Sequence, residues 1–153
     1  MPAGWRGISI LFALTACGVI VQAGAHDAPC VVMLAESKPK AACAVSTALL
    51  ARAPRLVEVP VTKILNPSGQ SFSIHLYLAG AKTTPELIGN VTVFPPDRTG
   101  VFMIRSQPAF ERFGASRAPA RIIIEIRRTS GSEALQPISV SIGPLRWLYE
   151  EPK

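Results

Sequence analysis

Phe72-Ser73-Ile74-His75-Leu76-Tyr77-Leu78 alternates apolar side chains with Ser, His and Tyr over its whole length. Alternation with a period of two is typical of a β-strand that buries one face and exposes the other. Four other segments have the same short, alternating or β-branched character: residues 57–61, 91–93, 122–126 and 138–142. The chain therefore predicts several strands whose apolar side chains share one buried core.

Turn-forming residues separate these segments at regular intervals. Residues 66–69 (Asn-Pro-Ser-Gly) and residues 95–100 (Pro-Pro-Asp-Arg-Thr-Gly) have the composition of chain reversals. A single helix is predicted between Ser106, a candidate N-cap, and Gly114, which suits a helix end. Short strands at this spacing, without long helices between them, predict an all-β fold. We expect an antiparallel β-sandwich of six or seven strands with one short helix over residues 56–149.

The alternation also assigns a face to each strand residue. Ser73, His75 and Tyr77 should lie on the outer face, and a shift of one residue would reverse every such assignment. Pro60 lacks an N–H group and should therefore lie at a sheet edge or a bulge. The predicted core consists of Val59, Val61, Phe72, Ile74, Leu76, Val91, Val93, Phe110, Ile122, Ile124, Ile126, Val140 and Ile142.

The first 25 residues have the composition of an export signal. Arg6 supplies a positive charge, and residues 8–21 form an apolar run that is short for a transmembrane helix. Ala23-Gly24-Ala25 offers the small residues that a signal peptidase requires, so cleavage before His26 is expected, and cleavage after Ala23 fits nearly as well. We interpret residues 1–25 as a signal peptide and expect a secreted, periplasmic or extracellular protein.

The same region supports an alternative signal. Leu14-Thr15-Ala16-Cys17 resembles a bacterial lipobox, in which residues 1–16 are removed and Cys17 is lipidated. The apolar residues 19–21 that follow are unlike the usual polar tether of a lipoprotein. Lipidation would anchor the protein to the envelope membrane, and no other membrane attachment is expected. Both signals place the chain outside the cytoplasm.

Cys30 and Cys43 remain in the mature chain whichever signal is used. Two cysteines in an oxidising compartment most simply form a disulfide. A thiolate metal site would need more ligands than the neighbouring sequence offers. We therefore predict a Cys30–Cys43 disulfide, which would tie residues 26–55, interpreted as an N-terminal extension, to the sandwich.

The charge is moderately positive, with 16 Lys and Arg against 10 Asp and Glu, a formal net charge of +6. The basic residues are scattered along the chain and are not gathered into a stripe or a helix face. Nucleic acid is therefore not an expected partner. A basic surface that serves solubility accounts for the charge, and contact with anionic surfaces is compatible with it.

The order of the segments over residues 57–148 resembles the small C-terminal β-sandwich domain of tyrosinases and plant polyphenol oxidases. Residues 71–74 (Ser-Phe-Ser-Ile) are similar to the Lys-Phe-Asp-Val motif of that family, although both charged positions are Ser here. Later segments are similar to the family's next strands and short helix in the same order: residues 88–94, 108–113, 121–131 and 138–145.

The resemblance implies an accessory and not a catalyst. In that family the domain covers a dinuclear copper site that six histidines hold in a preceding helical domain. This chain contains two histidines, and it has no nucleophile elbow, phosphate-binding loop or His-Glu-x-x-His motif. We expect no enzymatic activity and no cofactor. The expected function is that of a non-catalytic accessory acting in trans on a tyrosinase-like copper oxidase, by shielding or maturing its active site.

A different class of function is also compatible with these features. The chain would then be an envelope or extracellular binding module unrelated to copper oxidases, since β-sandwiches host many functions. A third and minor alternative is copper binding by the mature N-terminus. His26 with its free amine could chelate copper together with His75, and a terminus Gly24-Ala25-His26 would also suit Cu(II).

Two aromatic residues, Trp147 and Tyr149, follow the last predicted strand. Aromatic side chains at such a position either form a contact for a partner or cover the open end of a sandwich. The sequence leaves both interpretations open. Neither residue type nor spacing decides between them, because both roles require a large, partly apolar ring.

Overall fold

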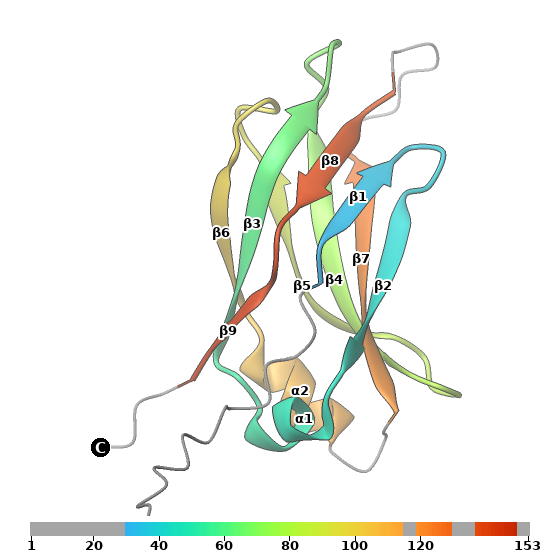
Figure 1. Ribbon diagram of the computed structural model, residues 1–153, viewed down its shortest axis with the longest axis vertical. Helices are drawn as coiled ribbons and strands as arrows, with labels where there is room; N and C mark the ends of the chain where they lie inside the picture. The colour runs from blue at the N-terminus through green and yellow to red at the C-terminus, as the bar shows by residue number, and fades with distance from the viewer. Residues whose placement is uncertain (1–29, 115–118, 130–136, 150–153) are drawn as a thin grey trace, which may run out of the picture.

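The computed structural model describes residues 30–114, 119–129 and 137–149, which form two antiparallel sheets packed face to face (Figure 1). The predicted all-β sandwich is confirmed. The described residues form nine strands and two helices, where we had expected six or seven strands and one helix. The elements are β1 (Val32–Ala35), β2 (Lys40–Val45), α1 (Thr47–Arg52), β3 (Leu56–Leu65), β4 (Phe72–Gly80), β5 (Glu86–Val93), β6 (Gly100–Arg105), α2 (Gln107–Phe113), β7 (Ala120–Arg128), β8 (Ser139–Ile142) and β9 (Arg146–Leu148).

One sheet has the strand order β1-β8-β3-β6, with β9 also paired to β3, and the other has the order β2-β7-β4-β5. Strands β1 and β2 form a hairpin whose two arms belong to different sheets, so the hairpin crosses one side of the sandwich (Figure 1). Helices α1 and α2 lie together at one end of the sandwich, and the β1–β2 turn lies at the other (Figure 1). None of the helices in the described ranges is long and apolar enough to cross a membrane.

The N-terminal boundary of the sandwich differs from the expectation. We interpreted residues 26–55 as an extension, but the described part of this range contributes an edge strand to each sheet and helix α1. Leu34, Leu49 and Leu50 of this range are buried in the common core. The low sequence periodicity of the region concealed this role, because edge strands bury few side chains. The predicted signal peptide, Cys17 and His26 lie outside the described residues.

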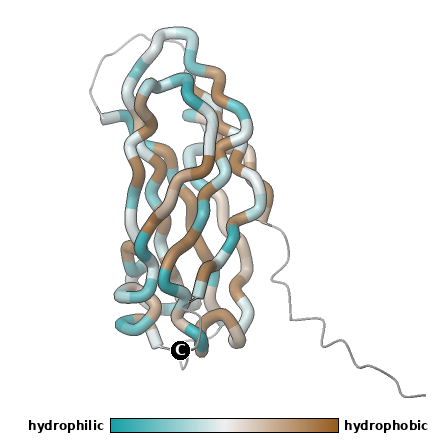
Figure 2. Tube along the Cα trace, turned by 90° about the vertical axis from the view of Figure 1, so that its left-hand side faces the viewer, coloured by the Kyte–Doolittle hydropathy of each residue, from teal (hydrophilic) through white to brown (hydrophobic). Residues whose placement is uncertain are grey.

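The predicted register is confirmed. Twelve of the thirteen predicted core residues are buried, and Val91 on the edge strand β5 is half-buried. Hydrophobic and hydrophilic residues alternate along the strands (Figure 2). The core therefore lies between the sheets, where the inward faces of β4 and β7 meet those of β3 and β8.

Pro60 lies in β3, an inner strand, but at an irregular point of it. Strand β9 pairs with residues 56–58 of β3 and strand β8 with residues 61–65, and the register shifts between Val61 and Lys63. The backbone N–H of Gly143 donates a hydrogen bond of 2.8 Å to the Pro60 carbonyl. Pro60 therefore lies next to a bulge, between the part of β3 that pairs with β9 and the part that pairs with β8, which agrees with the expectation of an edge or a bulge.

The predicted helix is present as α2. It ends before Gly114, whose backbone φ is 71°. Ser106 stands at the N-cap position of α2, as expected, but its side chain does not cap the helix. The Ser106 hydroxyl makes no cap bond and instead donates to the Pro54 carbonyl at 2.6 Å. Ser106 is fully buried, so its hydroxyl satisfies a buried carbonyl of the preceding segment. The unpredicted helix α1 has a regular cap, in which Ser46 Oγ accepts a bond from the Leu49 N–H.

Candidate functional site

The outer face of the β2-β7-β4-β5 sheet carries a polar cluster in its centre. Glu125 of β7 lies opposite Lys40 of β2 on one side and opposite His75 of β4 on the other. Its carboxylate accepts contacts from Lys40 Nζ at 3.3 Å and from Arg127 at 2.8 Å, although the residue is only 8% exposed. Burial opposes ionisation, but the hydrogen bonds from Arg127 and Lys40 outweigh it and lower the pKa of Glu125. Glu125 is therefore a charged, paired carboxylate at neutral pH.

His75 lies beside this carboxylate on the same face. Its Nε2 is hydrogen-bonded to Ser73 Oγ at 2.8 Å, and its ring stacks on Tyr77 with centroids 6.2 Å apart. Burial and the nearby Arg127 guanidinium lower the pKa of His75, against the opposite influence of Glu125. The imidazole is therefore neutral near pH 7.

Ser73, His75 and Glu125 lie side by side, as a nucleophile, a base and a carboxylate do in a catalytic triad. Their geometry opposes nucleophilic catalysis. Ser73 is 3% exposed, so a substrate carbonyl cannot reach its hydroxyl without displacing the neighbouring side chains. Glu125 already accepts from Arg127 and Lys40. The cluster is best described as a hydrogen-bonded network that orders the outer face.

The described residues do not assemble a metal site around His75. No group of three or more His, Cys, Asp and Glu side chains gathers within residues 30–114, 119–129 and 137–149. The expected partner His26 lies outside these ranges. The copper interpretation therefore stays a prediction about the N-terminus.

The two cysteines lie where the sequence predicted a bridge. Cys30 and Cys43 are at disulfide distance, with Cα atoms 5.7 Å apart. Cys30 lies two residues before the start of β1 in one sheet, and Cys43 is part of β2 in the other. The bridge therefore fastens the two edge strands to each other, across the side of the sandwich where the hairpin passes between sheets.

Trp147 and Tyr149 lie at the end of the sandwich that the helices cover, and both are half-buried. The Trp147 ring packs edge-on against Phe110 of α2, with centroids 5.5 Å apart. The guanidinium of Arg52 lies 3.8 Å from the centre of the Tyr149 ring. These contacts fit the role of covering the open end of the sandwich, and a partner contact by either residue stays a prediction.

A more exposed aromatic residue, which sequence reasoning missed, lies near the opposite end. Phe94 directly follows β5 and is 76% exposed, whereas Phe72, Phe110 and Phe113 are buried. Its loop is held by Asn66 of the neighbouring β3–β4 loop, which donates to the Pro96 carbonyl at 3.0 Å and to the Gln70 carbonyl at 2.8 Å. A signal was present in the sequence, since an aromatic residue directly before two prolines cannot continue a paired strand.

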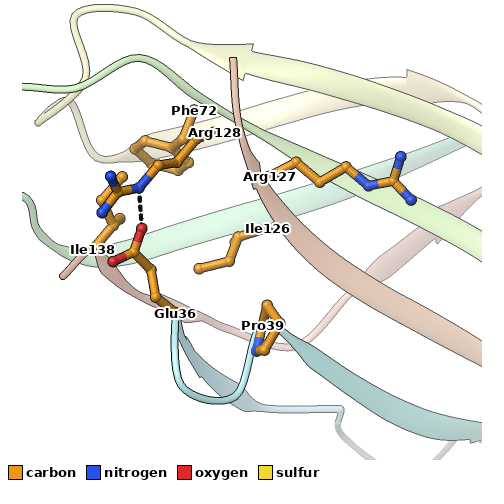
Figure 3. A pocket seen from close by; sticks show the side chains of 7 residues that line it. All are labelled: Glu36, Pro39, Phe72, Ile126, Arg127, Arg128 and Ile138. Atoms are coloured by element: carbon orange, nitrogen blue, oxygen red, sulfur yellow. Dashed lines mark hydrogen bonds and ion pairs between the residues drawn. The ribbon is translucent and has the colours of Figure 1, made fainter. Parts of the chain in front are cut away.

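A pocket of about 210 Å³ opens between the sheets at the end opposite the helices (Figure 3). Phe72, Ile126 and Ile138 supply apolar walls, and an ion pair between Glu36 and Arg128 stands beside them (Figure 3). Sequence reasoning missed this pocket as well. Residues 121–131 were interpreted as one strand with a basic turn, which does not indicate that Arg128 faces the core.

No protein-family model matches this chain, and no curated protein matches it.

Proposed function

We propose that the protein is an exported, non-catalytic accessory that docks on a separately encoded, tyrosinase-like copper oxidase. The proposal is supported by the order of segments that resembles the C-terminal domain of that family. Each of those segments overlaps a strand or helix of a β-sandwich, in the order β4, β5, α2, β7 and β8. The partner must carry the copper, because this chain has two histidines and the family's site uses six.

The observation that carries docking is the exposed ring of Phe94 on a loop that its neighbour holds in place. A large apolar ring in water favours burial in a partner, and aromatic residues dominate the energetics of interfaces. The hydrogen bond from Asn66 to the Pro96 carbonyl joins the β3–β4 and β5–β6 loops, and its bond to the Gln70 carbonyl holds Asn66 within its own loop. A loop that is already ordered loses little conformational entropy on binding, which favours affinity.

The mechanism that follows is steric. With Phe94 in a recess of the partner, the end of the sandwich lies over the entrance to the copper site. Phenolic substrates are then excluded, and the unfilled or immature site is protected until the accessory leaves. The chain itself requires no cofactor for this role.

Co-expression with a tyrosinase-like catalytic chain tests the proposal. The complex should be recovered by size exclusion, and phenol oxidation by the partner should fall while the complex persists. Phe94→Ala should weaken the complex about tenfold or more, as for an interface hot spot. Met33→Ala is the matched control, because Met33 is 74% exposed but lies on β1, and this variant should bind normally.

Two results would contradict the proposal. The first is the absence of both a complex and any change in phenol oxidation with the folded wild-type protein. The second is equal affinity of the Phe94→Ala and Met33→Ala variants for the partner. It would leave the loop that carries Phe94, here called the docking loop, without a role. Capture of an unrelated envelope or extracellular protein, dependent on Phe94, would instead establish the general binding module and exclude the oxidase as partner.

A further inference from the structure

The pocket between the sheets combines an apolar floor with a charged mouth. Phe72 and Ile138 are 1% exposed and Ile126 is 7% exposed, so these walls belong to the hydrophobic core. Among the described residues, a space of about 210 Å³ remains beside these walls at this end of the sandwich. An apolar cavity of about 150 Å³ already accommodates benzene in another protein. The space is thus large enough for a ring or chain of about six carbons.

Arg128 occupies an inward-facing position of its strand. Ile122, Ile124 and Ile126 of β7 point into the core, and the alternation continues to Arg128, which lies opposite Phe72. The Arg128 side chain is 25% exposed. An arginine directed between two sheets has a cost in desolvation, so a specific anionic partner is expected for it.

Glu36 supplies that partner from the other sheet. It follows β1 two positions after the buried Leu34, so it also continues an inward face. Arg128 Nε donates to Glu36 Oε1, and the Glu36 side chain is 28% exposed. The ion pair thus spans the mouth of the pocket, with both charged groups partly accessible to solvent.

One cation of the pocket lining faces the space beside the apolar walls. The lining contains the guanidinium groups of Arg127 and Arg128 and the carboxylate of Glu36. The Arg127 guanidinium points away from the ion pair (Figure 3) and contacts Glu125 on the outer face. Arg128 is therefore the cation that a ligand in the pocket would meet, and its planar fork matches a carboxylate.

We propose that this pocket binds a small aliphatic or aromatic carboxylate. The hydrocarbon part lies against Phe72, Ile126 and Ile138, and the carboxylate binds Arg128 in place of Glu36. The ligand's carboxylate takes the place of the Glu36 carboxylate, so this exchange removes no pairing from the guanidinium. The released Glu36 side chain, already partly exposed, moves into solvent. This site is independent of the docking loop of Phe94.

Hexanoate and 1-hexanol are suitable probes, because they share a six-carbon chain and differ in charge. Binding is measured by chemical-shift titration of the full mature protein, with the walls of the pocket as the responding residues. Hexanoate should bind more tightly than 1-hexanol. Arg128→Gln should weaken hexanoate about tenfold or more, as expected for the loss of a charge-assisted bond, and leave 1-hexanol unchanged.

Glu36→Gln gives the opposite prediction, and this separates a ligand site from a structural ion pair. It removes the competing carboxylate, so hexanoate should bind several-fold more tightly. Arg127→Gln is the matched control, with the same change of charge one residue away, and should bind as the wild type does. If Arg128→Gln fails to fold, the Glu36→Gln variant decides alone.

Three results would overturn the proposal. Equal affinity for hexanoate and 1-hexanol would show that Arg128 does not bind the carboxylate. An Arg127→Gln effect as large as that of Arg128→Gln would show a general charge effect. Absence of binding of either probe to the wild type and to Glu36→Gln would show that the ion pair only closes the core.

Discussion

Gly89 of β5 faces Ile104 of β6 across the edge where the two sheets meet. A Cβ atom on the glycine would lie 2.5 Å from Cγ2 of Ile104, closer than two carbon atoms can approach. Ile104 is itself buried, with 5% of its surface exposed, and the contact would involve the methyl group on its branched Cβ. The absence of a side chain at position 89 therefore allows the edge strands of the two sheets to close this side of the core.

Gly89→Ala should lower the free energy of unfolding by about 1–3 kcal/mol, as overpacking does in a well-packed core. Chemical denaturation measures the loss. Ile104→Ala removes the clashing methyl group, so in the double variant the penalty of the alanine should largely vanish. Strictly additive effects of the two substitutions would contradict the close contact.

The Cys30–Cys43 bridge should contribute about 3 kcal/mol to stability by restricting the unfolded chain. It joins residues 13 apart in sequence and connects the edge strands of both sheets. Replacement of both cysteines by Ser should lower the denaturation midpoint accordingly. Dithiothreitol should lower the midpoint of the wild type to that of the double variant and leave the variant unchanged. An insensitive wild type would show that the bridge does not form.

The ion-paired Glu125 should make stability depend on pH in the acid range. Its pKa in the folded state lies below the ordinary value of 4.5, so its stabilisation is complete above pH 4.5. The stabilisation is lost as the pH falls through the lowered folded-state pKa. Glu125→Gln should cost about 2 kcal/mol at pH 7, and its difference from wild type should shrink below pH 4.5.

The exposed Glu111 offers the control for this measurement. Glu111→Gln should change the stability by less than about 0.5 kcal/mol at pH 7, as for most surface substitutions. Unfolding curves are recorded between pH 3 and pH 7 for all three proteins. A difference between Glu125→Gln and wild type that stays constant over the whole range would contradict the lowered pKa.

Trp147 should stabilise the end of the sandwich through its contact with Phe110. Trp147→Ala should cost about 2 kcal/mol, less than a fully buried tryptophan because the ring is half-buried. Trp147→Phe keeps an aromatic contact and should cost about half as much. Both variants should leave binding of the oxidase partner unchanged once they are folded. A loss of binding without a loss of stability would instead assign Trp147 to the partner contact.

The mature N-terminus can be fixed by intact mass spectrometry of protein exported with its own leader. The expected chain begins at His26 and contains the Cys30–Cys43 disulfide. A chain that begins at Cys17 with the added mass of lipid would show the lipoprotein alternative and exclude the amine of His26 from metal binding. For a start at His26 or Gly24, stoichiometric Cu(II) binding lost in His26→Ala would support the minor copper site, and unchanged binding would end it.

Much of the fold follows from local sequence patterns. The alternation at residues 72–78 correctly predicts that Phe72 and Ile74 are buried, because side chains on successive strand residues must point to opposite faces. The helix that ends before Gly114 was also predicted, since a glycine that ends a helix acts within a single turn. Such preferences depend on neighbours in the chain, and the sequence displays those neighbours directly.

The functional features depend on neighbours distant in sequence. Nothing local indicates that β1 and β2 join different sheets, or that Glu36 meets Arg128 from 92 residues away. The loop that carries Phe94 is likewise held by Asn66, which bonds the carbonyl of Pro96 from 30 residues away. Local alternation determines which face of a strand an apolar residue occupies. The packing of the two sheets decides which charged groups meet at the open end and which ring remains in solvent, because each of these contacts forms between segments that only the folded chain brings together.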